Sequence, residues 1–123
     1  MNKETHKVLK RLERMAEEES LPSIGPVKGK IIEDMIQDYK PKRILEIGTL
    51  YGYSAILMGS MLPEGQNQGK VTTIEIDKES ANIARKNIEE AALDERVEVV
   101  NGDALDIIPK LHENLDMVIP GWY

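Results

Sequence analysis

The chain has 123 residues, of which 41% are apolar and 31% charged, a composition typical of one soluble globular domain. It contains no cysteine, which excludes disulfides and thiolate metal sites, and no apolar run approaches the ~20 residues that cross a bilayer. The net charge of −6 and the absence of Phe argue against a nucleic-acid partner. The charged N-terminus does not fit a signal peptide, so we expect a cytoplasmic protein without a membrane partner.

Two helices are predicted first. Residues 3–19 place apolar side chains on one helical stripe, at Val8, Leu9, Leu12, Met15 and Ala16, and we expect this stripe to pack on the domain or on a partner. Two prolines and a glycine within residues 21–26 then prevent a continuous helix. Apolar residues recur at helical spacing before Pro41, at Val27, Ile31, Ile32, Met35, Ile36 and Tyr39. Within one domain, we divide the chain into an N-terminal helix (1–22) and a remainder (23–123).

A short apolar strand is predicted at residues 43–47, followed by Gly48, Gly52 and a helix over 54–62. Strand, glycine turn and helix form the entry to a doubly wound parallel sheet, where ligands lie at the carboxyl ends of the strands. Glycine admits a ligand to the backbone and tolerates positive φ. A dinucleotide fingerprint requires Gly-x-Gly-x-x-Gly, and the wider spacing here makes an NAD-dependent oxidoreductase a distant alternative.

The rest of the chain alternates between strands at 71–76, 97–100 and 115–119 and helices at 80–93 and 104–111. Glu75 ends a strand about 20 residues past the glycines, where a carboxylate can accept both ribose hydroxyls of a nucleoside. The alternative is an ordinary strand-end carboxylate in solvent. Asp77 is expected to cap the next helix. After the third strand, Gly102 leaves room for a flat base, and Asp103 either contacts an adenine amino group or only caps a helix that Pro109 shortens.

These residues share a pattern with a known family. Glu46-x-Gly48-x-x-x-Gly52-x-Ser54, with Glu75 and Gly102-Asp103 at later strand ends, resembles class I S-adenosylmethionine-dependent methyltransferases, most closely the catechol and caffeoyl-CoA O-methyltransferase-like branch. The resemblance runs from about residue 24 to 119. It implies an α/β fold, a Rossmann-like parallel sheet with helices on both faces. The chain would supply only the first four strands, in the order 3-2-1-4, of the seven that the family has.

The resemblance also implies the cofactor, S-adenosylmethionine. Glu75 would hold its ribose, Ile76 would lie against the adenine, and Ile24 would lie near the methionine end, although Ile24 is equally well read as part of a simple joining loop. The full set of cofactor-binding residues that we expect is Ile24, Glu46, Gly48, Leu50, Gly52, Ser54, Glu75, Ile76, Gly102, Asp103 and Ala104.

The acceptor side of this family is not found in the sequence. The resemblance implies Mg²⁺ held by an Asp after the fourth strand and an Asp-Asn pair after the fifth, whereas Pro120-Gly121-Trp122-Tyr123 contains no carboxylate. No Mg²⁺ ligand and no catalytic residue can therefore be assigned, and we expect His6 and His112 to be solvated. Two functions stay open. One is an O-methyltransferase acting on a small hydroxylated acceptor, impaired by truncation; the other is a non-catalytic cofactor-binding half-domain or interaction module.

The fourth strand carries a further expectation. In the full fold it is central, whereas here residues 115–119 would form a sheet edge with unpaired backbone groups. Such an edge favours pairing with another chain. We therefore predict a homodimer, or a larger assembly, through the fourth strand, with Met117, Val118 and Ile119 near the contact.

Overall fold

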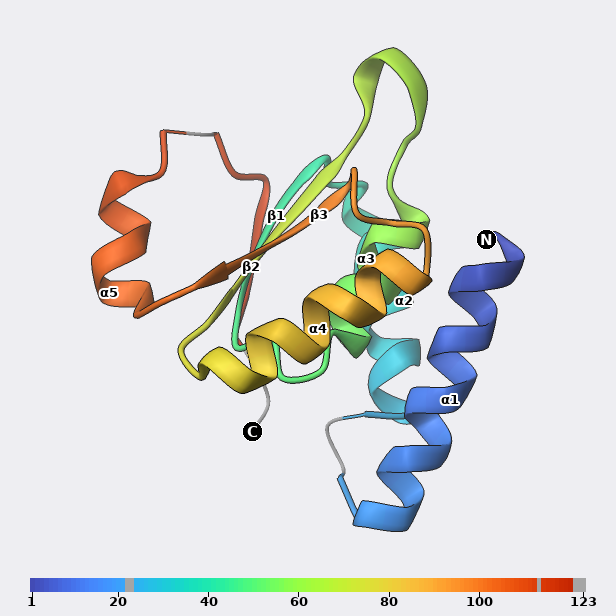
Figure 1. Cartoon of the computed structure of the whole chain (residues 1–123). Coiled ribbons are helices and arrows are strands. Elements are labelled where there is room, and N and C mark those ends of the chain that lie inside the picture. Colours follow the sequence, from blue (N-terminus) through green and yellow to red (C-terminus); the bar gives the residue numbers. More distant parts are fainter. Residues whose placement is uncertain (22–23, 113, 121–123) are drawn as a thin grey trace.

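A four-stranded parallel sheet with helices on both faces forms the body of the protein (Figure 1). The computed structural model describes residues 1–21, 24–112 and 114–120. The strands run in the order β3-β2-β1-β4, which confirms the predicted order. Their bounds are β1 (Arg43–Ile47), β2 (Lys70–Glu75), β3 (Val97–Asn101) and β4 (Met117–Pro120).

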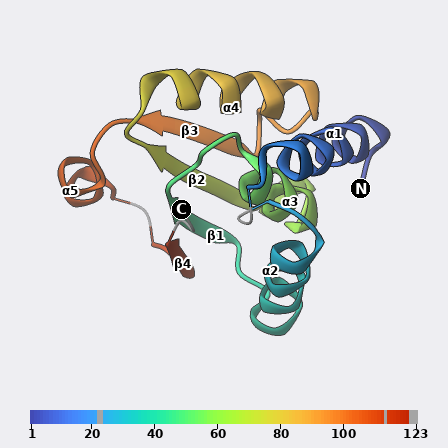
Figure 2. The same cartoon turned by 90° about the horizontal axis from the view of Figure 1, so that it is seen from below.

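The helices divide between the two faces of the sheet. Figure 2 shows α1 to α3 on one side of the sheet and α5 on the other. Buried residues of α4 belong to the same hydrophobic cluster as those of α1 and α3. Right-handed crossovers explain this division, because the steps β1 to β2 to β3 place α3 and α4 on one face and the return to β4 places α5 on the other. The bounds are α1 (Lys3–Glu19), α2 (Pro26–Tyr39), α3 (Tyr53–Met61), α4 (Lys78–Glu90) and α5 (Ala104–Ile107), with single 3₁₀ turns at Gly65–Asn67 and Ile108–Lys110.

The main core lies between the sheet and the four helices α1 to α4. The predicted stripe of α1 is confirmed, since Val8, Leu9, Leu12 and Ala16 are buried and Met15 is partly buried. The stripe predicted for α2 is partly wrong. Val27 and Tyr39 are 80% and 74% exposed, and Lys28 is buried with Ile32 and Ile36 instead. Positions four apart share one face of a helix, so the buried face of α2 is rotated by one residue from the apolar pattern.

Two predicted helices end earlier than expected. α4 begins after Asp77, whose side chain accepts from the Ser80 N–H as the predicted cap, but it ends at Glu90 rather than at 93. The chain turns there, with Ala92 at φ 60°. α5 keeps only four residues before a 3₁₀ turn that contains Pro109, because proline cannot donate the next helical hydrogen bond.

The fourth strand begins two residues later than predicted, at Met117 rather than at Leu115. Just before it, Asp116 Oδ2 accepts hydrogen bonds from the backbone N–H groups of Lys42 and Arg43, both at 2.9 Å. These bonds hold the pKa of Asp116 below its usual value. They also fix β4 beside β1 with Ile44 opposite Met117. Residues 22 and 23 of the predicted break, and the last three residues, 121–123, lie outside the described part of the chain.

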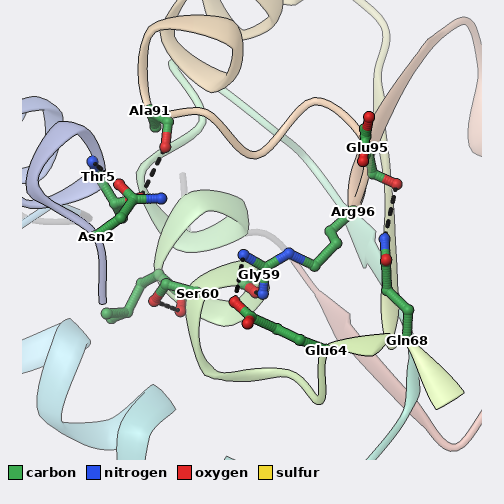
Figure 3. A network of polar contacts seen from close by, with 10 residues as sticks. Asn2, Thr5, Gly59, Ser60, Glu64, Gln68, Ala91, Glu95 and Arg96 are labelled. Carbon is green, nitrogen blue, oxygen red and sulfur yellow. Dashed lines mark hydrogen bonds and ion pairs between the residues drawn. The ribbon is translucent and has the colours of Figure 1, made fainter. Parts of the chain in front are cut away.

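Close contacts bind α1 and α3 to the rest of the fold (Figure 3). The Thr5 hydroxyl donates to the Ala91 carbonyl at 2.7 Å, so α1 is tied to the end of α4. Arg96, just before β3, donates to the Gly59 carbonyl of α3 at 3.2 Å. α3 approaches β3 closely because Gly59 has no side chain, and a Cβ there would lie 2.5 Å from Val97 Cγ2.

Candidate functional site

The carboxyl ends of three strands meet at one edge of the sheet. The Gly48 N–H, just past β1, donates to the Ile74 carbonyl of β2 at 2.7 Å. The Gly102 N–H, just past β3, donates to the Glu75 carbonyl at 2.9 Å. The structure thus brings together Gly48, Glu75 and Gly102, which the sequence places at three separate strand ends. In an open parallel sheet this edge is where ligands bind.

Glu75 is a buried carboxylate that holds two backbone segments. The residue is only 4% exposed. Its Oε1 accepts from the Leu50 N–H at 2.8 Å, and its Oε2 accepts from the Asp77 N–H at 3.0 Å. The alternative of a solvated strand-end carboxylate is therefore wrong. An ionised carboxylate is an acceptor only, so its chemistry suits hydroxyl donors such as those of a ribose.

Residues 48–52 form a turn that we call the glycine loop. Gly48 and Gly52 have φ values of 97° and 91°, which glycine adopts without steric cost. Leu50 also has a positive φ, of 50°, which is uncommon for a residue with a side chain. The hydrogen bond from Leu50 to Glu75 helps to hold this conformation. At the end of the loop, Gly52 packs against α4, and a Cβ there would lie 3.5 Å from Ala84.

Each of the three residues between the glycines is held by a different side chain. Leu50 is held by Glu75, as described. The Thr49 hydroxyl lies 2.6 Å from the Thr73 hydroxyl of β2. The Tyr51 carbonyl accepts from Asn87 Nδ2 of α4 at 2.8 Å. The loop is therefore held by side chains of β2 and α4.

Glu46, on β1, is the second buried carboxylate of this region and is 1% exposed. The Thr73 hydroxyl donates to its Oε1 at 2.8 Å, so the Thr49 hydroxyl in turn donates to Thr73. Burial raises the pKa of Glu46 to about 7, against the opposing effects of Thr73, the Lys28 charge and the Ser54 hydroxyl. Lys28 itself is 6% exposed, and burial lowers its pKa while the Glu46 charge raises it. The charges of a buried acid and a buried base thus act on each other.

The predicted adenine side is more open. Ile76 follows β2 and is 72% exposed, as an apolar surface for a base would be. Asn101 Nδ2 donates to the carbonyls of Glu75 and Ile76, at 2.8 and 3.2 Å, and so fixes the end of β2. Ile107 occupies the space beside Gly102. A Cβ on Gly102 would lie 2.6 Å from Ile107 Cδ1, so in this structure the glycine makes room for α5.

The other predicted site residues lie around these groups. Asp103 caps α5 by accepting from the Leu105 N–H at 2.9 Å, which confirms the capping role. Ala104, the first residue of α5, is half-buried. Ser54 is the second residue of α3 and is 7% exposed. Ile24, also 7% exposed, precedes α2, and its N–H donates to the Leu21 carbonyl at 3.3 Å.

The described residues offer no cluster of three or more His, Cys, Asp or Glu side chains that could hold a metal ion. The donor set that the family resemblance implies for Mg²⁺ is thus not matched within 1–21, 24–112 and 114–120, and we derive no step through this ion. The same part of the chain has no helix with the length and apolar character that a membrane span needs.

Three residues of this network, Lys28, Asn87 and Thr73, were not predicted from the sequence. Lys28 lies four residues before Ile32 and eight before Ile36, on the buried face of α2. Asn87 lies between Ala84 and Ile88 on the buried face of α4, and Thr73 lies inside β2. For Lys28 and Asn87, the available signal was a polar residue at a helical position that the neighbouring apolar residues mark as buried.

Comparisons with known proteins place this arrangement in a family. A family model described as O-methyltransferase matches residues 1–118. The catechol O-methyltransferase of Niastella koreensis is 42% identical over 91 residues, which cover 74% of this chain and 40% of that protein.

Solved structures agree with this match. TomG, an O-methyltransferase from Streptomyces achromogenes in complex with S-adenosylmethionine, superimposes with a TM-score of 0.79 at 32% identity. The O-methyltransferase from Bacillus cereus in complex with S-adenosylhomocysteine gives 0.77 at 36% identity. The matches cover 94% and 93% of this chain and 53% of each solved chain. The chain therefore spans about half the length of the relatives it matches.

Proposed function

This chain belongs to the O-methyltransferase family, and we propose that it binds S-adenosylmethionine at the glycine loop and the ends of β2 and β3. The observation that carries the proposal is the bond between Glu75 and the glycine loop. A buried carboxylate at the end of β2 accepts from the Leu50 N–H. The residue that we propose to bind the ribose is therefore joined directly to the glycine loop. The bound cofactors of the Bacillus cereus and Streptomyces relatives support this reading.

The proposed roles follow the chemistry of each residue. Glu75 accepts from the ribose hydroxyls, and the exposed Ile76 covers one face of the adenine. Gly102, Asp103 and Ala104 flank the edge of the base. Gly48, Leu50 and Gly52 bring backbone close to the cofactor. Glu46, Ser54 and Ile24 line its methionine end, and because Glu46 is buried here, a ligand reaches it only after neighbouring side chains move.

The proposed reaction is methyl transfer to a small hydroxylated acceptor. The acceptor oxygen attacks the sulfonium methyl group, an O–C bond forms as the C–S bond breaks, and S-adenosylhomocysteine leaves as a neutral thioether. The hydroxyl proton passes to a base. Such a displacement depends on positioning and on the pKa of the acceptor, and the described residues carry only the cofactor part of that requirement.

A second candidate function is cofactor binding without turnover. The observation that favours it is the lack, among the described residues, of the donor cluster that a Mg²⁺-dependent acceptor site needs.

In either case we propose that β4 pairs with β4 of a second copy. It lies at the sheet edge in the described structure, and Val118 is 54% exposed.

Calorimetry tests the proposed function. We expect S-adenosylmethionine and S-adenosylhomocysteine to bind with one site per chain, and NAD not to bind. Absence of binding by both sulfur ligands would refute the cofactor proposal. An assay for methylation of a catechol acceptor with added Mg²⁺ then separates the two candidates, because turnover excludes the non-catalytic one.

A further inference from the structure

Asn87 links the glycine loop to the N-terminal helix. The residue is 4% exposed, and both ends of its amide are used. Its Nδ2 donates to the Tyr51 carbonyl at 2.8 Å, and its Oδ1 accepts from Arg11 Nη2 of α1 at 2.9 Å. These bonds join segments 36 and 76 residues apart in the sequence.

The Arg11 end of this link is anchored a second time. Arg11 Nη2 also lies 2.9 Å from Glu90 Oε2, and Glu90 follows Asn87 by one turn on α4. Both ionic side chains are about half exposed, so this surface ion pair contributes little by itself. The Arg11–Asn87 bond is different, because it fixes the orientation of a buried amide. With Oδ1 facing Arg11, Nδ2 must face the loop.

We propose that Asn87 is a positioning residue for the cofactor, and that Arg11 acts through it to couple the docking of α1 to the conformation of the glycine loop. This inference rests on the proposed function. Asn87 lies on α4, whereas Thr73 and Glu75, which bond to Thr49 and Leu50, lie on β2. The Asn87 bond is therefore a hydrogen bond through which the helical layer, and not the sheet, acts on the loop.

Loss of the hydrogen bond between Asn87 and Tyr51 should change the conformation of the glycine loop more than that of the rest of the protein. The loop contains a non-glycine residue at positive φ, Leu50, and its conformation is kept by the side chains around it. Without the Asn87 donor, the Tyr51 carbonyl loses a partner and the loop gains alternative conformations. Cofactor binding would then have to order the loop again, which lowers affinity without altering any residue that touches the cofactor.

The sharpest variant is Asn87→Asp. It keeps the oxygen that accepts from Arg11 but replaces the donor to Tyr51 with a second acceptor. Glu90→Gln is the matched control, because it weakens the other partner of Arg11 on the same helix and leaves Asn87 intact. Arg11→Met tests the coupling to α1. Two measurements are needed for each: amide hydrogen exchange of residues 50–53 without ligand, and the dissociation constant of S-adenosylhomocysteine below the unfolding transition.

We expect Asn87→Asp to speed exchange in the loop and to weaken binding about tenfold, the effect of one lost hydrogen bond. Arg11→Met should act in the same direction by a smaller factor, and Glu90→Gln should change neither measurement. A purely structural role would lower the unfolding midpoint but leave both the loop exchange and the affinity of the folded protein unchanged, which would overturn the proposal. Should Asn87→Asp not fold, Asn87→Ser at the same position decides by the same two measurements.

The two proposals fail separately. If the unmodified protein does not bind S-adenosylhomocysteine, the proposed function is wrong, yet loop exchange still decides whether Asn87 orders residues 50–53. If binding occurs and Asn87→Asp alters exchange but not affinity, the proposed function survives and the positioning role is refuted.

Discussion

Glu75 and Leu50 are joined by a 2.8 Å hydrogen bond from a backbone N–H to a buried carboxylate, across 25 residues of sequence. Because the other carboxylate oxygen holds the Asp77 N–H, Glu75 fixes both the glycine loop and the start of α4. A charge-assisted hydrogen bond of this kind is among the stronger ones in proteins. Glu75 therefore shapes the site as well as offering a ligand to it.

The first prediction concerns this carboxylate. Glu75→Ala should weaken binding of S-adenosylhomocysteine by about 1.5–3 kcal/mol, because hydrogen bonds to a charged group are lost. Glu79→Gln, an acidic residue in the first turn of the nearby α4, is the control and should leave affinity unchanged. Calorimetry on the folded variants provides the measurement. An unaltered dissociation constant in Glu75→Ala would remove Glu75 from the ribose site.

The second prediction concerns pH. The pKa of Glu46 is raised to about 7 in the folded protein from an ordinary 4.5, so between these values the folded state binds more protons than the unfolded state. Stability should therefore fall as pH rises through this window, by on the order of 3 kcal/mol in total. Glu46→Gln cannot titrate and should lack this contribution.

Denaturant unfolding at a series of pH values checks the predicted pH dependence of stability. The difference in unfolding free energy between Glu46→Gln and the unmodified protein isolates this residue, because the other titrating groups cancel. It should shift in favour of the variant as pH rises from about 5 to about 8. Two parallel pH profiles would contradict the assignment.

The third prediction concerns the approach of α3 to β3. Alanine normally stabilises a helix interior relative to glycine by up to about 1 kcal/mol. At Gly59 the sign should reverse, because the new Cβ would lie 2.5 Å from Val97 Cγ2. We expect Gly59→Ala to lower the unfolding free energy by about 1–3 kcal/mol, the usual cost of overpacking.

A compensating change tests the cause. Val97→Ala removes the methyl group that the new side chain meets, so the double variant should lose less stability than the sum of the two single variants. Urea unfolding measures all three. Simple additivity would show that the contact with Val97 is not the source of the cost.

The fourth prediction concerns the edge strand. If β4 pairs between copies, Val118→Lys should disrupt the pairing, because an edge lysine discourages strand addition. Val27→Lys, on the exposed side of α2, is a control with a similarly exposed residue. Sedimentation should show the assembly for the unmodified protein and for Val27→Lys, and a monomer for Val118→Lys. A monomeric unmodified protein at high micromolar concentration would refute the dimer.

The sequence was sufficient for most element bounds, because period and glycine spacing report local structure directly. The order of the strands, which the structure confirms, followed instead from the family resemblance. The sequence failed where tertiary packing competes with a local pattern. The apolar residues Val27 and Tyr39 of α2 are exposed while Lys28 is buried, where its charge interacts with that of Glu46 on β1. No local pattern carries that information.

The sequence also predicted that three residues of the candidate site would lie close together. Gly48, Glu75 and Gly102 mark strand ends, and parallel topology brings strand ends together. The residues that hold the glycine loop were not predicted, because Thr73 and Asn87 act through contacts between separate elements. At Gly102, the neighbour that lies where a Cβ would be is Ile107, five residues ahead, which spacing alone does not reveal.

The pairing of β4 with β1 has a consequence for the order of folding. Ile44 and Met117 face each other only after all the intervening chain has been drawn into a closed loop, while the strand that closes it has four residues. Closing so long a loop costs entropy that a short strand recovers only when its neighbours are already in place. β4 should accordingly be the last strand to form during refolding and the first to detach.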